Sequence, residues 1–152
     1  MQISRTCEGD LPGLRVVLDS IELFPAEMLA DLIAPFLAGS GGDDLWLTCR
    51  VDGQISGLCF ARLEALTNGT WNMLALGVLS AQQGRGLGTG IVAHLEASLR
   101  DREARVMIVD TSSKDAFAQA RTFYRKAGYA QVAVIPDFWD AGDDKVIFHK
   151  AL

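Results

Sequence analysis

Residues 82–90 read QQGRGLGTG, in which four of nine residues are glycine. An apolar stretch, TWNMLALGVL at 70–79, comes before it and predicts a buried strand. Apolar residues then recur at steps of four, which predicts a helix that begins inside the glycine-rich stretch: Leu87, Ile91, Leu95 and Leu99. A turn between a strand and a helix N-terminus presents free backbone N–H groups, and the helix dipole adds about half a positive charge. The stretch therefore predicts an anion-binding loop.

Two common phosphate-binding patterns do not fit this loop. A P-loop needs a lysine where Gly90 stands when the pattern is counted from Gly84. The dinucleotide fingerprint GxGxxG needs a third glycine, but that position is Thr89 when counted from Gly84. Counted from Gly86, it is Ile91. The spacing thus argues against a nucleotide-binding module, which remains one alternative.

The pattern that is left, Gln83-x-x-Gly86-x-Gly88, resembles the acetyl-CoA pyrophosphate loop of the GNAT N-acetyltransferases, written Arg/Gln-x-x-Gly-x-Gly/Ala. A second stretch, ARTFYRKAGY at 120–129, resembles the family's other hallmark, A-x-x-FY-x-x-x-GF. The two motifs stand in the family's order, with one predicted strand between them. The closing segment also resembles the final strand pair of many members. The resemblance covers most of the chain and is densest from Trp71 to Tyr129.

Composition limits the class of protein. The 152 residues suit a single domain spanning 1–152, and 49% hydrophobic content is enough for a core. A net charge of −5 argues against nonspecific nucleic-acid binding, and no apolar run is long enough to span a membrane. Cys7, Cys49 and Cys59 form neither a CxxC pair nor an even set, and the two histidines are too isolated for a metal site. We expect a cytoplasmic protein, with Cys49 and Cys59 buried on strands.

Periodicity predicts a mixed α/β (α+β) fold with a largely antiparallel, twisted sheet. Asp52-Gly53 joins two apolar runs as a hairpin. Asp10 is a candidate N-cap, Pro35 should kink or end a helix, and Gly128 should follow the last helix as its C-cap. The expected strands are 45–51, 54–63, 70–79, 104–110, 130–135 and 145–151, and the expected helices lie at 11–21, 25–36, 87–99 and 117–127. Six to seven strands, about four helices and two splayed central strands are what the GNAT resemblance implies.

The same resemblance implies how a cofactor would bind. The pantetheine arm of acetyl-CoA would pair with the end of the strand at 70–79, where a backbone N–H could also stabilise the developing oxyanion. Its pyrophosphate would lie on the glycine loop, with side-chain donors from Gln83 and Arg85. Phe117 stands where many members carry an asparagine that contacts this arm. The expected cofactor-binding residues are Leu76, Gly77, Val78, Gln83, Gly84, Arg85, Gly86, Leu87, Gly88, Thr89, Phe117, Ala120 and Tyr124.

Tyr124 is the candidate general acid, because a phenol with a pKa near 10 is protonated at neutral pH and can protonate a departing thiolate. The alternative is that it only packs in the core. Glu64 is the candidate general base, and a solvated strand-end glutamate is its alternative reading. Asp110 and His94 are weaker candidates, and water could remove the amine proton instead.

The acceptor is expected to be a primary amine of a small molecule or peptide. Its pocket should be built from Phe24, Glu64, Phe138 and Trp139, the last two beside several aspartates. The sequence leaves open a non-catalytic acyl-CoA-binding domain of the same fold. A homodimer is possible, since dimers are common in the family.

Overall fold

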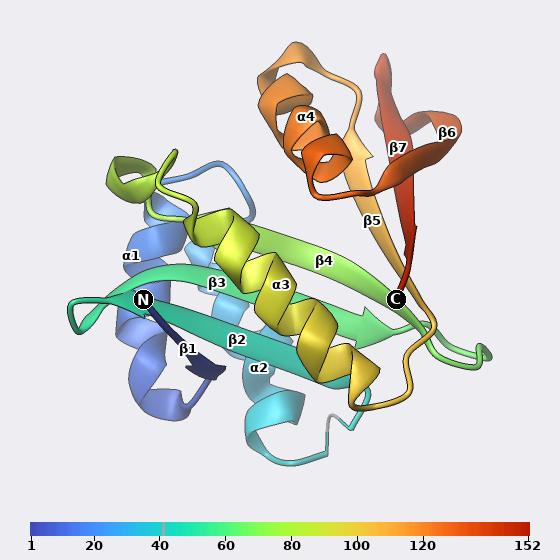
Figure 1. Ribbon diagram of the computed structural model, residues 1–152. Helices are drawn as coiled ribbons and strands as arrows, with labels where there is room; N and C mark the ends of the chain where they lie inside the picture. The colour runs from blue at the N-terminus through green and yellow to red at the C-terminus, as the bar shows by residue number, and fades with distance from the viewer. Residues whose placement is uncertain (41) are drawn as a thin grey trace.

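The computed structural model describes residues 1–40 and 42–152. It shows one seven-stranded sheet, ordered β1-β2-β3-β4-β5-β7-β6, with helices on both faces (Figure 1). All neighbouring strands are antiparallel except β4 and β5. The strands are β1 (Gln2–Arg5), β2 (Asp44–Val51), β3 (Gln54–Leu63), β4 (Thr70–Val78), β5 (Val106–Ser112), β6 (Ala130–Asp140) and β7 (Asp143–Ala151). This confirms the predicted largely antiparallel α/β sheet.

Four α-helices cover the sheet, as predicted: α1 (Leu11–Asp19), α2 (Leu29–Leu37), α3 (Leu87–Arg100) and α4 (Ala118–Lys126). In Figure 1, α1 and α2 lie behind the sheet, and α3 crosses its front. Each layer has its own core. Apolar residues of α1 and α2 pack with Trp46 and Phe60, whose rings stack at 4.1 Å. Residues of α3 and α4 pack with Met107 and Phe148 on the opposite face.

The β2–β3 hairpin closes as its turn residues predict. Asp52 and Gly53 both have positive φ values, 50° and 80°, which is the geometry of a type I′ turn. Val51 pairs directly with Gln54 across the turn. Its strands carry Cys49 and Cys59, which are both buried and free, as predicted.

The central strands separate soon after they meet. The parallel pairing of β4 with β5 joins only Thr70 to Val106, Trp71 to Met107 and Asn72 to Ile108. Just beyond these pairs, the β3–β4 register shifts by one residue, which makes Leu74 a β-bulge. The rest of β4 then has β3 alone as its strand neighbour, and in Figure 1 it diverges visibly from β5. The predicted splay is therefore confirmed.

Four local features differ from the predictions. The strand β1 was not predicted, because QISR is too short to show alternation. The first helix ends at Asp19, so Ile21 lies in the following loop. Pro35 lies inside α2, which continues to Leu37. A proline so near the end of a helix removes one backbone bond, and the turn still closes through Ala38 N donating to Ala34 O at 3.0 Å. The strand β6 runs on to Asp140.

One buried carboxylate ties the front helix to the end of the chain. Glu96 on α3 is 5% exposed. It accepts hydrogen bonds from Lys150 Nζ at 2.8 and 2.9 Å and from Tyr129 Oη at 2.9 Å. Arg100 Nη2 lies 3.3 Å from the same carboxylate. Because each carboxylate oxygen has charged or hydroxyl partners, this contact fixes α3 against β7.

We predict that Glu96→Gln lowers the free energy of unfolding by about 2 kcal/mol, because removing the charge leaves Lys150 partly buried without its partner. This loss of stability is smaller than that expected for a fully buried ion pair, because Lys150 and Arg100 remain partly exposed to water. Urea unfolding would measure it. The control is Glu103→Gln at an exposed position, and equal stability of the two variants would contradict the assignment.

Candidate functional site

A cleft of about 940 Å³ opens where β4 and β5 separate. One wall is the outer half of β4 with the α1–α2 loop, and the other is the end of β5 with α4 and the start of β7. The glycine-rich loop before α3 closes one end. The predicted site residues that line the cleft are Phe24, Leu76, Gly77, Val78, Gln83, Gly84, Gly86, Leu87, Gly88, Thr89, Phe117, Ala120, Tyr124 and Trp139. Glu64, Arg85 and Phe138 are not among the lining residues.

The glycine-rich loop offers hydrogen-bond donors to the cleft. Gly84 and Gly86 adopt positive φ values of 74° and 81°, and Gly86 is the N-cap of α3 without a side-chain cap. Within the part of the chain that the structure describes, no backbone N–H from Gly84 to Thr89 donates to a protein acceptor. The first regular helix bond is made by Gly90 N to Gly86 O at 3.0 Å. A row of free donors at a helix N-terminus favours an anion.

The two predicted side-chain donors of the loop, Gln83 and Arg85, both form hydrogen bonds within the protein. Gln83 Nε2 donates to the carbonyl oxygen of Val78 at 3.2 Å, which ties the loop to the end of β4. The Arg85 guanidinium donates to the side chain of Gln82 and is exposed. These contacts hold both side chains to the loop and the end of β4, and the backbone N–H groups of the loop remain as donors without a partner among the described residues.

The β4 wall is shaped by the α1–α2 loop. A Cβ on Gly77 would meet Ile21 Cδ1 at 2.7 Å and Leu23 Cδ2 at 3.4 Å. The missing side chain therefore lets both residues pack directly against the strand. Because Ile21 and Leu23 flank Glu22, this packing holds the backbone of Glu22 at the edge of the cleft.

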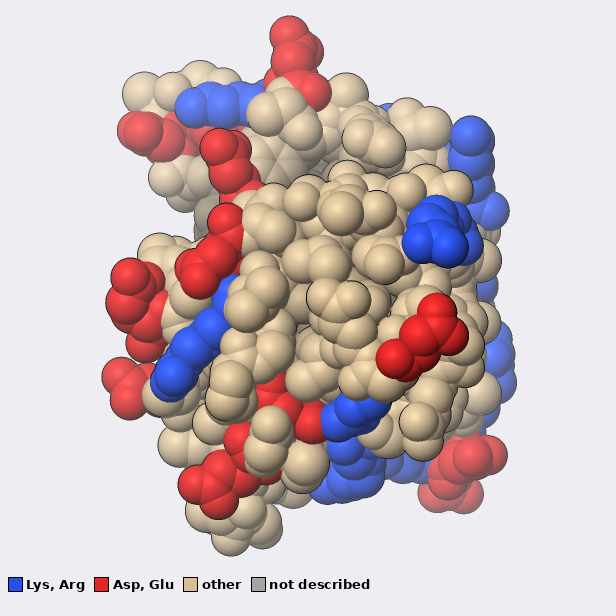
Figure 2. Space-filling view, turned by 90° about the vertical axis from the view of Figure 1, so that its left-hand side faces the viewer, with Lys and Arg blue, Asp and Glu red and all other residues tan. Residues whose placement is uncertain are grey.

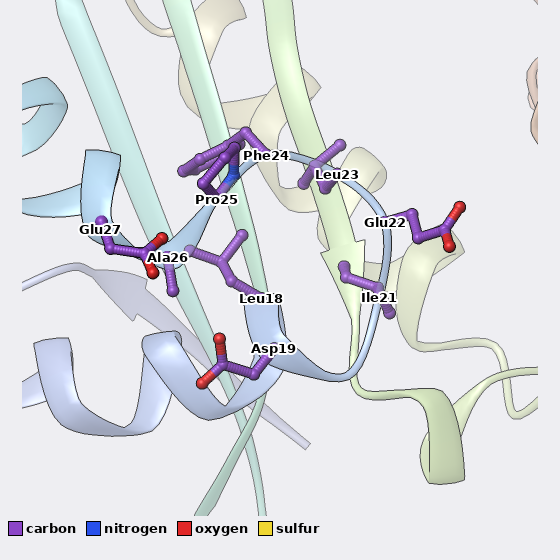
Figure 3. Close-up of a pocket in the computed structure, with 9 residues that line it drawn as sticks. All are labelled: Leu18, Asp19, Ile21, Glu22, Leu23, Phe24, Pro25, Ala26 and Glu27. Atoms are coloured by element: carbon purple, nitrogen blue, oxygen red, sulfur yellow. The ribbon is translucent and has the colours of Figure 1, made fainter.

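The α1–α2 loop also encloses a smaller hollow of about 410 Å³ beside the cleft. The two share residues 21–24 in their walls. Figure 3 shows the side chains that surround the hollow. Asp19 and Glu27 lie near Leu18, whereas Glu22 extends to the other side of the loop.

Tyr124 belongs both to the core and to the cleft. It is 9% exposed and contacts the rings of Phe123, Tyr129 and Phe148, with centroids 5.5, 6.2 and 5.6 Å away. Burial raises the pKa of its phenol well above the ordinary value, and the neighbouring thiol of Cys59 adds to the rise. The hydroxyl is therefore protonated throughout the physiological range, and it makes no hydrogen bond to the described residues.

The start of α4 lies beside the glycine loop. A Cβ on Gly88 would touch the Phe123 ring at 3.4 Å, so the loop glycine allows α3 and α4 to approach closely. Phe117 is the N-cap of α4 and gives no side-chain capping bond. With Ala120 it supplies an apolar surface on this side of the cleft, where the family's asparagine would supply a polar one.

Glu64 takes part in a chain of polar contacts behind the cleft. Asn72 Nδ2 donates to Glu64 Oε1 at 2.8 Å and to Asp110 Oδ2 at 3.1 Å. Lys145 Nζ lies 3.0 Å from the same Asp110 oxygen. Among the described residues, Asn72 Oδ1 and Asp110 Oδ1 are buried without a hydrogen-bond partner. Asp110 lines the cleft, whereas Glu64 does not. Among the described residues, the hydrogen bonds therefore connect Glu64 to the cleft through Asn72 and then Asp110.

The two aromatic residues predicted for the acceptor pocket have different positions. Trp139 lines the cleft, is 49% exposed, and donates from Nε1 to Thr111 O at 3.3 Å. Phe138 packs edge-on against Trp139 at 4.7 Å and lies under Lys145 Nζ at 4.3 Å, outside the lining. Trp139 therefore faces the cleft, and Phe138 packs against Trp139 outside the lining.

Sequence reasoning missed several residues of the cleft. Glu22, Leu74 and Ser112 line it, and Asn72 lies behind it. The signal for Glu22 was its place between two apolar residues, Ile21 and Leu23, in a loop. Asn72 could have been found as a polar residue in the middle of an otherwise apolar strand. None of the four belongs to a short motif.

Several comparisons place the chain among known proteins. A family model described as the acetyltransferase (GNAT) domain matches residues 42–131. A solved GNAT-family acetyltransferase structure from Desulfovibrio desulfuricans is 26% identical with a TM-score of 0.88, over 99% of this chain and 98% of that chain. No curated protein matches the chain.

Among its described residues, none of the helices combines the length and apolar character that crossing a membrane requires.

Two more distant structures share the fold. The ribosomal-protein-alanine N-acetyltransferase from Brucella melitensis is 20% identical with a TM-score of 0.79, covering 100% of both chains. An aminoglycoside 6'-N-acetyltransferase solved with coenzyme A is 19% identical with a TM-score of 0.74, over 99% of this chain and 97% of that chain. At these identities the likeness concerns the fold alone. The match of the family model over more than half of the sequence shows that the chain belongs to the GNAT family of acetyltransferases.

Proposed function

We propose that the chain is an acetyl-CoA-dependent N-acetyltransferase, a single catalytic domain over residues 1–152 that acts on a primary amine of a small molecule or peptide. The observation that carries the proposal is the row of free N–H groups from Gly84 to Thr89, which opens onto the same cleft as Tyr124. A protein of the same fold was solved with coenzyme A, which supports this choice of donor. Three free cysteines fit a cytoplasmic location.

The cleft fits the chemistry of such a donor. Acetyl-CoA, when bound, supplies a thioester-activated acetyl group together with a pyrophosphate and an amide-bearing arm. The loop donors suit the pyrophosphate, because backbone N–H groups bind phosphate oxygens without a buried cation. Leu76, Gly77 and Val78 have no neighbouring strand on the side of β5, so their backbone can pair with an extended chain. Arg85 would add charge after releasing Gln82.

We assign to Tyr124 the role of donating its Oη–H to the departing sulfur. Its raised pKa keeps the phenol protonated, so the donor is present at every physiological pH. The same rise makes complete proton transfer to the less basic thiolate unfavourable even when the sulfur carries the full negative charge. The hydrogen bond therefore stabilises the departing thiolate. The amine releases one proton to water, and the thiolate takes up one proton from water to become the free thiol.

We assign no dedicated base to the amine. Glu64, the sequence-based candidate, does not line the cleft, and Asn72 lies between it and Asp110. An amine proton would reach Glu64 only through that chain of contacts. Water at the mouth of the cleft is the simpler acceptor, and Glu64 then serves to orient Asn72.

We predict that Tyr124→Phe lowers kcat by about 100-fold, the lower range for a general acid, while the Kd of coenzyme A changes less than about threefold. Thiol release measures the rate, and calorimetry measures binding. The matched control is Tyr129→Phe, which removes the hydroxyl bonded to Glu96 outside the cleft lining. It should cost about 1 kcal/mol of stability and little activity. An unchanged kcat in Tyr124→Phe would contradict the assigned role.

We predict that Gly86→Ala weakens coenzyme A binding at least about tenfold. Its φ of 81° strains an alanine by about 1–2 kcal/mol, and relief of that strain turns the N–H groups away from the ligand. The matched control is Gly39→Ala after α2, with a φ of 74° and equally open space at Cβ. Both variants should lose similar stability, but only Gly86→Ala should lose binding.

A ligand comparison tests the same loop. Coenzyme A should raise the melting temperature of the wild-type protein more than ATP or NAD does at equal concentration. A larger shift with either nucleotide would favour a nucleotide-binding module over the proposed enzyme.

A further inference from the structure

We propose that the acceptor is a small aliphatic amine with a second positively charged group, held between Glu22 and Asp143. This inference names the substrate class of the proposed enzyme and rests on that function. It comes from the charges that line the cleft.

The charged side chains among the described lining residues are all acidic: Glu22, Asp110 and Asp143. Asp110 is compensated by Lys145 at 3.0 Å. Among the described residues, Glu22 and Asp143 have no basic partner within ion-pair distance. The cleft therefore carries two uncompensated negative charges, and low-dielectric walls strengthen their attraction for a cation.

These two carboxylates lie on opposite walls. Glu22 belongs to the α1–α2 loop, held against Gly77 by its neighbours Ile21 and Leu23. Asp143 begins β7, and its carboxylate accepts a hydrogen bond from the Ser112 hydroxyl at the end of β5. The backbone of Glu22 and the side chain of Asp143 are therefore both held against the sheet, and their carboxylates form a pair of negative sites on the two walls.

The surface between them is apolar. Phe24 and Trp139 line the cleft from the two walls, and Leu74 projects from the bulge of β4 with 44% exposure. A hydrocarbon spacer can lie on these side chains while the ammonium group that is not acetylated meets the carboxylates and the other nitrogen, once it has lost its proton to water, attacks the thioester. The arrangement suits a flexible diamine better than a neutral amine or an anion.

Two further observations agree with a cationic acceptor. The hollow next to the cleft contributes Asp19 and Glu27, which extend the negative potential toward α1 and α2. Figure 2 shows acidic side chains gathered mainly along one edge of the molecule, on the side where α1 and α2 lie, with most basic side chains at the opposite edge. Asp110 lines the cleft, and its buried carboxylate oxygen Oδ1 has no donor among the described residues. Groups that only accept hydrogen bonds favour a ligand that donates them.

The test compares 1,4-diaminobutane with n-butylamine, which has the same chain length and lacks the second charge. At low ionic strength the wild-type kcat/KM should favour the diamine at least about tenfold, and added salt should reduce the preference. Glu22→Gln and Asp143→Asn should each lower the diamine-to-monoamine ratio about three- to fivefold, as expected for a partly exposed ion pair. The matched controls, Glu103→Gln and Asp101→Asn at the far end of α3, should keep the wild-type ratio.

Calorimetric Kd values of the two amines separate this inference from the proposed function. Turnover of both amines with equal kcat/KM, or a preference that neither cleft substitution reduces, overturns the inference and leaves the transferase intact. No thiol release with either amine or with a panel of peptide amines, together with tighter diamine binding that Glu22→Gln weakens, overturns the proposed function and supports the dicationic site.

Discussion

The separation of β4 from β5 is the constraint on which the rest of the molecule depends. Three parallel residue pairs join the two halves of the sheet, and the bulge at Leu74 follows immediately. A continuous ladder would have satisfied the backbone of β4 on both sides and left no space between the strands. Because the ladder stops at Asn72, one edge of β4 stays available and the cleft has walls of regular secondary structure. Sites held by strands are positioned more precisely than sites held by loops alone.

The local parts of this arrangement could be predicted from sequence. The turn at Asp52-Gly53 and the glycine loop depend on residue types at fixed spacing, and Tyr124 was found by its motif. The contacts of Asn72 with Glu64 and Asp110 could not be predicted, because they depend on where the parallel pairing stops. The packing of Ile21 on Gly77 joins residues far apart in the chain, and no periodicity reveals it. Gln83 has a motif position that suggests a ligand contact, yet in the structure its amide binds Val78.

The proposed roles use different groups of the cleft. Backbone donors dominate at the glycine loop, where an anion is expected, and the carboxylates of Glu22 and Asp143 lie on the two walls of the cleft, where an amine is expected. Tyr124 lies in the cleft with its ring in the core, and its hydroxyl has no hydrogen-bond partner among the residues that the structure describes. These groups would let one cleft attract two ligands of opposite charge.

The anchoring of α3 has a consequence for how tightly the glycine-rich loop can bind a ligand. Its first turn packs against Phe123, and its third turn is fixed by Glu96 to Lys150. The donors from Gly84 to Thr89 are thus already aligned before any ligand arrives. Little conformational entropy is then lost on association, so affinity follows from contacts already in place rather than from ordering of the loop.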